Sequence, residues 1–240
     1  MSHDTDHSRP PGAAETEQFM AVAAHDLRNP IAVVKASAQM AQRQLRRGDL
    51  DAAQGRLAAI VEQSDRLTEM LESFVDAARI SAGALKLRTE KVELRELVVA
   101  AEVRARALIG DHIQRTVELS IEDGLVGTWD RARMIRAIRA LLANAFLYGD
   151  AASPVQVSAV HAGGRVQLRV CGFGPGPDVD EQQHLFEQFF RGRSAADAGQ
   201  SGSGLGLFTA RGIAREHGGE VRRIERDVFE LEVPLAAAQS

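Results

Sequence analysis

Cysteine is almost absent from this sequence, because Cys171 is the only one among 240 residues. One cysteine cannot form a disulfide within the chain, and the Cys/His clusters that hold structural zinc are missing as well. These absences exclude a disulfide-stapled secreted domain and a zinc finger. They favour a reducing compartment, and we expect a cytoplasmic protein.

Long hydrophobic runs and blocks of like charge are also absent. No window of 18 or more consecutive apolar residues occurs, and the N-terminus has no basic stretch followed by an apolar one. We therefore expect no membrane segment in this chain and no export signal. Lys plus Arg number 29 and Asp plus Glu number 33, a net charge of −4 with interleaved signs, which argues against nucleic acid as a partner.

Aromatic residues make up only 5% of the chain, so most of its apolar content is aliphatic and suits helices. Apolar residues recur every three or four positions from Thr16 to Arg46, and again from Asp51 to about Ser81. This spacing predicts a helical hairpin over residues 16–84, after a disordered N-terminus over residues 1–15. Each helix would leave apolar surface uncovered, which predicts a homodimer that forms a four-helix bundle. The alternative is that the hairpin packs on the rest of the chain.

The second half of the chain mixes helical periodicity with the alternating pattern of strands, which predicts an α+β sandwich over residues 92–236. Gly163-Gly164 lies between two alternating runs and predicts a β-hairpin. The expected helices are 92–109, 131–148, 180–191 and 204–217, and the expected strands are 115–122, two within 155–172, and 228–235.

Glycine is concentrated late in the chain, in GFGPG (172–176) and GQSGSGLGL (199–207). Glycine loops expose backbone N–H groups that can surround an anion, and the second cluster runs into a helix whose N-terminus favours phosphate. The sequence contains neither a Walker GxxxxGK[ST] loop nor a Rossmann GxGxxG fingerprint after a strand. A phosphate site and plain turns both remain open interpretations.

His25 is the most suggestive side chain of the first helix. It lies beside Asp26 and one turn before Asn29, and Pro30 follows inside the helix. A proline there costs roughly 3 kcal/mol and frees the carbonyl group four residues back. Asp26 could accept an imidazole proton and make the other nitrogen nucleophilic. A passive surface histidine is the alternative.

HDLRNP (25–30) resembles the H-box of sensor histidine kinases of two-component systems, and the later motifs of that family follow in order. LLANAFLY (141–148) is similar to the N-box, VCGFGPG (170–176) to the G1-box, LFEQFFRG (185–192) to the F-box and GSGLGL (202–207) to the G2-box. The resemblance covers residues 16–236. It implies a dimerisation and phosphoacceptor hairpin followed by an ATP-binding α+β sandwich of the GHKL type.

The resemblance implies ATP-dependent autophosphorylation and transfer to a response regulator aspartate. His25 would be the phosphoacceptor, Asp26 the general base, and Asn29 the residue that orients water for dephosphorylating the partner. Asn144 would coordinate Mg2+. The implied ATP contacts are Asn144, Tyr148 along the adenine, Arg191 near the γ-phosphate, and Gly174, Gly176, Gly202, Ser203, Gly204, Leu205 and Gly206 around the phosphates.

Departures from the family pattern bear on ATP binding. Gly172 stands where the G1-box normally has an Asp that accepts a hydrogen bond from the adenine amino group, and Leu147 replaces a frequent phosphate-contacting Lys. Losing one buried hydrogen bond weakens binding by up to about a hundredfold. Ala140 stands near where related ATPases have a water-activating Glu, which argues against a hydrolase.

Three functions therefore remain open on the sequence. The first is an active histidine kinase. The second is a phosphotransfer or phosphatase protein whose nucleotide domain is degenerate, and the third is a scaffold that binds a response regulator or another kinase.

Overall fold

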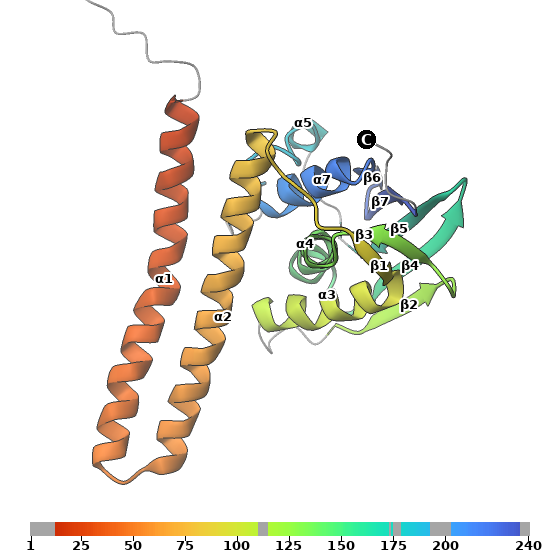
Figure 1. The fold of residues 1–240 in the computed structure, drawn as a ribbon. Coiled ribbons are helices and arrows are strands. Elements are labelled where there is room, and N and C mark those ends of the chain that lie inside the picture. Colours follow the sequence, from red (N-terminus) through yellow and green to blue (C-terminus); the bar gives the residue numbers. More distant parts are fainter. Residues whose placement is uncertain (1–12, 110–114, 173, 175–178, 193–202, 236–240) are drawn as a thin grey trace, which may run out of the picture. The chain divides into compact units, whose positions relative to one another are not determined.

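The structure is a computed structural model, which describes residues 13–109, 115–172, 174, 179–192 and 203–235 (Figure 1). It divides into two compact units, Met1–Met70 and Leu71–Ser240. The boundary between these units falls inside the second helix. Among the described residues, no helix combines the length and the apolar composition that a membrane span requires.

The first unit contains α1 (Ala13–Arg46) and most of α2 (Leu50–Ser81), which confirms the predicted helices. Gly48 adopts φ +76° in the turn between them, where residues with a side chain are strained. Asp49 Oδ1 accepts a hydrogen bond from the Ala52 N–H at 3.1 Å and caps α2. Pro30 lies inside α1, as the sequence predicts. Residues 1–12 of the expected disordered segment lie outside the described residues.

Much of the apolar surface of this unit is exposed. Small residues such as Ala41 and Ala53 are buried, whereas the large apolar residues Met40, Leu45, Leu50, Leu57 and Val61 are 45 to 67% exposed. An uncovered apolar surface on paired helices is what the predicted four-helix bundle would bury.

The second unit has a five-stranded sheet in the order β2-β4-β5-β7-β6, in which β2 pairs parallel to β4 and the other neighbours are antiparallel. A separate two-stranded sheet pairs β1 with β3. Helices α3, α4 and α7 lie on one side of the larger sheet (Figure 1). The elements are β1 (Glu90–Glu93), α3 (Leu94–Ile109), β2 (Val117–Ile121), β3 (Val126–Trp129), α4 (Arg131–Tyr148), β4 (Val155–Ala162), β5 (Arg165–Cys171), α5 (Val179–Gln182), α7 (Gly206–Glu216), β6 (Glu220–Glu225) and β7 (Val228–Pro234).

Alternation along the strands divides this unit into an apolar core and a charged outer face. Val166, Leu168 and Val170 of β5 are fully buried. The intervening Arg165 and Arg169 form ion pairs of 2.8 and 2.9 Å with glutamates of β7. This pattern confirms the predicted α+β sandwich.

Some sequence predictions for this unit were wrong or incomplete. A helix over 180–191 was expected, but only Val179–Gln182 is helical, and turns follow up to Phe189, which has φ +63°. Strands β1, β3 and β6 were not anticipated. β1 and β3 have only four residues each, and β6 carries charges at most positions, so none shows a clear alternation.

Candidate active site

Helix α4 supplies the central face of the candidate site. Asp130 caps its N-terminus by accepting from the Arg133 N–H at 3.1 Å, and the helix then runs to Tyr148 without interruption. Ala140, Asn144 and Tyr148 follow one another at intervals of four residues and therefore share one face. Asn144 is half-buried and Tyr148 is partly exposed.

The first residue of α7, at the end of the glycine-rich segment, lies against this face. A Cβ built on Gly206 would be 3.6 Å from the Ala140 Cβ. Gly204 has φ +69°, and a Cβ there would lie 2.6 Å from the Phe189 carbonyl carbon. Ser203 accepts a hydrogen bond from the Leu205 N–H at 3.4 Å, and Leu205 is buried. The amide end of α7 is therefore one helical turn from Asn144, where free N–H groups favour phosphate.

The end of β5 meets the end of α4 at a second group of glycines. A Cβ on Gly174 would lie 2.7 Å from the Tyr148 carbonyl oxygen, and one on Gly149 would lie 1.9 Å from the Gly172 carbonyl oxygen. Only glycine permits these approaches. The structure thus places Gly206 against Ala140 and Gly174 against Tyr148, one turn before and one turn after Asn144 on α4.

Arg191 belongs to the same neighbourhood. Burial raises the pKa of the Tyr148 hydroxyl, and the positive charge of Arg191 acts against this shift. The two side chains are therefore close enough to interact electrostatically. Gly176 and Gly202, which the sequence also predicted in this site, lie outside the described residues.

Arg115 was missed by the sequence analysis and lies directly beneath the glycines. It is only 4% exposed. Its guanidinium donates to the carbonyl oxygens of Ser153 at 2.7 Å and Gly172 at 3.1 Å, and also to that of Ala145. Burial lowers its pKa, and the negative charge of Asp150 opposes this shift. Nothing in the sequence separates this arginine from others that precede a strand.

The predicted phosphoacceptor group lies in the first unit, on α1. His25 is helical, and its side chain lies outside what the structure describes. Asp26 is half-buried and Asn29 is exposed. The spacing of four residues places His25 and Asn29 on one face of the helix.

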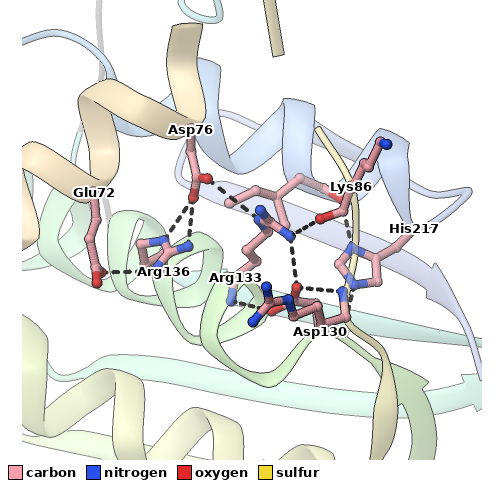
Figure 2. A network of polar contacts seen from close by, with 9 residues as sticks. Glu72, Asp76, Lys86, Asp130, Arg133, Arg136 and His217 are labelled. Carbon is pink, nitrogen blue, oxygen red and sulfur yellow. Dashed lines mark hydrogen bonds and ion pairs between the residues drawn. The ribbon is translucent and has the colours of Figure 1, made fainter. Parts of the chain in front are cut away.

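A buried polar network at the base of α4 was also missed, and Figure 2 shows it. Asp76, from the last turns of α2, is 2% exposed. Its carboxylate contacts Arg136 Nη2 at 2.7 Å and Arg133 Nε at 3.4 Å. Arg136 also pairs with Glu72 at 2.8 Å. Residues 71–81 of α2 are thereby joined to the helix that carries Asn144.

The same network extends to a buried histidine (Figure 2). Arg133 Nη1 contacts Asp130 Oδ2 at 2.8 Å and donates to the Lys86 carbonyl oxygen. The Asp130 N–H donates to His217 Nε2 at 2.9 Å, and His217 Nδ1 lies 2.8 Å from the Ile213 carbonyl oxygen. These partners require the neutral tautomer with the proton on Nδ1. Burial accordingly lowers the pKa of His217.

Known families match both parts of the chain. Residues 15–83 match the His Kinase A (phospho-acceptor) domain, and residues 129–237 match the family of histidine kinase-, DNA gyrase B- and HSP90-like ATPases. The match to the second family includes the whole of α4, both described glycine segments and α7.

Individual relatives cover most of the chain. Signal transduction histidine-protein kinase AfsQ2 of Streptomyces coelicolor is 28% identical over 86% of this chain and 38% of its own length. Signal transduction histidine-protein kinase BaeS of Escherichia coli is 28% identical over 85% of this chain and 42% of its own length. The chain thus spans about two fifths of the length of these relatives.

Solved structures share the fold. Acinetobacter baumannii histidine kinase AdeS superposes with a TM-score of 0.59 and 20% identity, over 88% of this chain and 98% of that one. At this identity the similarity concerns the fold alone.

Proposed function

Because the chain belongs to the histidine kinases of two-component systems, we propose that it phosphorylates itself on His25 with ATP and passes the phosphoryl group to a response regulator aspartate. Both family matches, to a phosphoacceptor hairpin and to an ATPase-type domain, support this proposal. The observation that carries it is the meeting of α4, the end of β5 and the start of α7 around Asn144.

The donor set at this meeting point suits a nucleoside triphosphate. Backbone N–H groups at Ser203–Gly206 would bind the phosphates, and the base would lie between Tyr148 and Gly172. Asn144 offers a neutral amide oxygen, which fits Mg2+ that keeps several waters. When bound, Mg2+ would neutralise charge on the transferring phosphoryl group. We also assign Arg191, Gly174, Gly176 and Gly202 to this site.

The transfer itself would be an in-line displacement. A nitrogen of the His25 imidazole attacks the γ-phosphorus, the bond to the bridging oxygen breaks, and ADP leaves. Asp26, the next residue, would accept the imidazole proton. Asn29, one turn away, would orient water when the phosphorylated partner is hydrolysed. Positioning rather than covalent chemistry would supply most of the rate.

We propose that the chain acts as a homodimer through residues 16–84, with residues 92–236 as the catalytic domain and residues 1–15 as a disordered N-terminus. The exposed apolar residues of α1 and α2 support the dimer. We place the reaction in the cytoplasm, where ATP and reduced thiols such as Cys171 occur.

The second candidate is a phosphotransfer or phosphatase protein that no longer uses nucleotide. Gly172 favours it, since this residue offers no side-chain acceptor to an adenine amine. The kinase requires Asn144 for its activity, whereas a protein that does not use nucleotide does not require it.

The test is a time course of autophosphorylation with labelled ATP and Mg2+ for the full chain and for Asn144→Asp. A kinase should lose labelling by at least about a hundredfold in this variant. The carboxylate of the new aspartate would place a negative charge beside the negatively charged phosphates. An unchanged thermal midpoint would show that the fold persists. Labelling of Asn144→Asp at the wild-type rate would refute the assigned site.

A further inference from the structure

Arg115 lies where three segments of the second unit meet. It comes just before β2. Because β2 is parallel to β4 and β5 is antiparallel to β4, the starts of β2 and β4 and the end of β5 lie at the same end of the sheet. The last turn of α4 reaches this place too, since Ala145 and Gly172 both supply carbonyl oxygens to the guanidinium. A single side chain therefore contacts the end of α4, the end of β5 and the loop before β4.

Every nitrogen of the Arg115 guanidinium donates to a backbone carbonyl oxygen. Nε donates to Ser153 at 2.7 Å, Nη1 donates to Gly172 at 3.1 Å and also to Ala145, and Nη2 donates to Pro154 at 3.4 Å. Arg115 is only 4% exposed, so water has little access to these carbonyl groups. Without the guanidinium, the three segments would have to move for their carbonyl oxygens to find other donors.

Gly149 and Gly172 leave the space that the guanidinium fills. A Cβ on Gly149 would overlap Arg115 Nη1 and the Gly172 carbonyl oxygen, and a Cβ on Gly172 would lie 2.9 Å from Arg115 Nη2. Gly149 has φ −84°, which any residue adopts, so the close approach alone requires glycine at this position. The backbone at the ends of α4 and β5 is thus packed around the guanidinium.

This backbone leads directly into residues assigned to nucleotide binding. Gly174 follows Gly172 by two residues, and a Cβ on Gly174 would lie 2.7 Å from the Tyr148 carbonyl oxygen. Ala145, whose carbonyl group Arg115 holds, lies one turn before Tyr148. A shift of Ala145 relative to Gly172 would therefore move Gly174 against Tyr148.

We propose that Arg115 is a positioning residue for nucleotide binding. It ties the end of α4 to the end of β5 and so sets the spacing of the two segments between which the base would lie, without itself touching the nucleotide. The inference rests on the proposed function, because it assumes that a nucleotide binds between these segments. A displacement of about 1 Å in a site can cost about a hundredfold. We therefore expect the loss of Arg115 to weaken nucleotide binding by at least about tenfold.

The first experiment measures the dissociation constant of Mg-ATP by calorimetry for the wild-type chain and for Arg115→Met, which keeps a long side chain but has no donors. Autophosphorylation gives the KM for ATP and the rate at saturating ATP. We expect both constants to rise at least about tenfold and the saturating rate to stay within about threefold. A fold defect lowers the rate at an unchanged KM, because only the folded fraction reacts. That result, or an unchanged dissociation constant, would overturn the inference.

Arg115→Lys separates the geometry of the guanidinium from its charge, and it decides the question if Arg115→Met does not fold. Lysine keeps the positive charge but loses the planar fork that reaches several carbonyl groups at once. The affinity for Mg-ATP should again fall at least about tenfold. Wild-type affinity in Arg115→Lys would mean that positive charge alone favours the nucleotide, and would overturn the inference.

Arg133→Met is the matched control. Arg133 is also buried, at 8% exposure, and it pairs with Asp130 and Asp76 at the opposite end of α4. This variant should lower the thermal midpoint and keep the wild-type dissociation constant. An equal loss of affinity in Arg133→Met would contradict a positioning role for Arg115. If the wild-type chain binds no Mg-ATP at millimolar concentration, the proposed function is overturned together with this inference.

Discussion

Asp76 of α2 and Arg136 of α4 form a 2.7 Å ion pair between Oδ2 and Nη2, with side chains that are 3% and 12% exposed. This pair fastens the last turns of α2 to the helix that carries Asn144. The division between the two compact units falls at Met70 and Leu71, before this contact along α2. Residues 71–81 therefore belong structurally with the ATPase-type domain, although they continue the helix of the hairpin.

Removing the charge of Asp76 should destabilise the second unit. Asp76→Asn leaves two buried guanidinium groups without this carboxylate, and breaking a buried pair costs about 3 to 5 kcal/mol. We expect about 3 kcal/mol, because Arg133 keeps Asp130 and Arg136 keeps Glu72. Denaturant unfolding measures this loss. The control is Asp65→Asn, at an exposed position of the same helix, and equal effects of the two variants would contradict the account.

The buried His217 should make stability depend on pH. Its pKa is lowered in the folded state by burial, so the unfolded chain binds the proton more readily. His217 should leave the free energy of unfolding unchanged above about pH 6.5 and lower it below that pH, by at most about 1.4 kcal/mol per pH unit. Asp130 and Glu220, whose pKa values are lowered, contribute a separate loss only below about pH 4.5.

The variant His217→Gln should abolish the fall between about pH 6.5 and 5 and leave the loss at lower pH. Thermal midpoints measured across this range would show it. A profile that His217→Gln does not change would mean that another group titrates there.

Gly204 should be required for nucleotide binding. An alanine there combines a strained φ with a Cβ 2.6 Å from the Phe189 carbonyl carbon, so the segment before α7 must move. Gly204→Ala should lower nucleotide affinity at least about tenfold, a loss of about 1.4 kcal/mol. Gly163→Ala is the matched control, because Gly163 has φ +58° with nothing within 4 Å of its Cβ position. Equal losses of nucleotide affinity in both variants would indicate general destabilisation and would contradict a specific role of Gly204.

The exposed apolar surface of α2 should hold the dimer. Leu57 and Val61 are 51 and 62% exposed and lie one turn apart. Two charges in place of these side chains would have to be buried without partners, so Leu57→Glu/Val61→Glu should yield a monomer. Light scattering at micromolar concentration measures the mass. Arg56→Glu, at an exposed neighbouring position, should remain dimeric, and a dimeric double variant would place the interface elsewhere.

Periodicity predicted the long elements well and short ones poorly. α4 has the predicted bounds, because eighteen residues with an Asp130 cap give an unambiguous helical pattern. The four residues of β1 and β3 are too few for any period to emerge. The segment 180–191 has helical spacing, but only Val179–Gln182 forms a helix and turns follow.

The residues of the candidate site also divide into those that the sequence predicts and those that it does not. Asn144, Tyr148 and the glycines could be predicted because they form contiguous motifs. Arg115 lies 57 positions from Gly172 in the sequence, and Asp76 lies 57 positions from Arg133. Such pairs depend on tertiary packing, which a local pattern of residue types does not encode.

The most direct test is incubation of the purified chain with γ-labelled ATP and Mg2+, beside His25→Gln, with acid and alkali treatment of the labelled protein. We predict a label that acid removes and alkali does not, which is the behaviour of phosphohistidine, and no label on His25→Gln. A folded, dimeric protein that takes no label, or a label that persists in His25→Gln, would contradict the proposed histidine kinase.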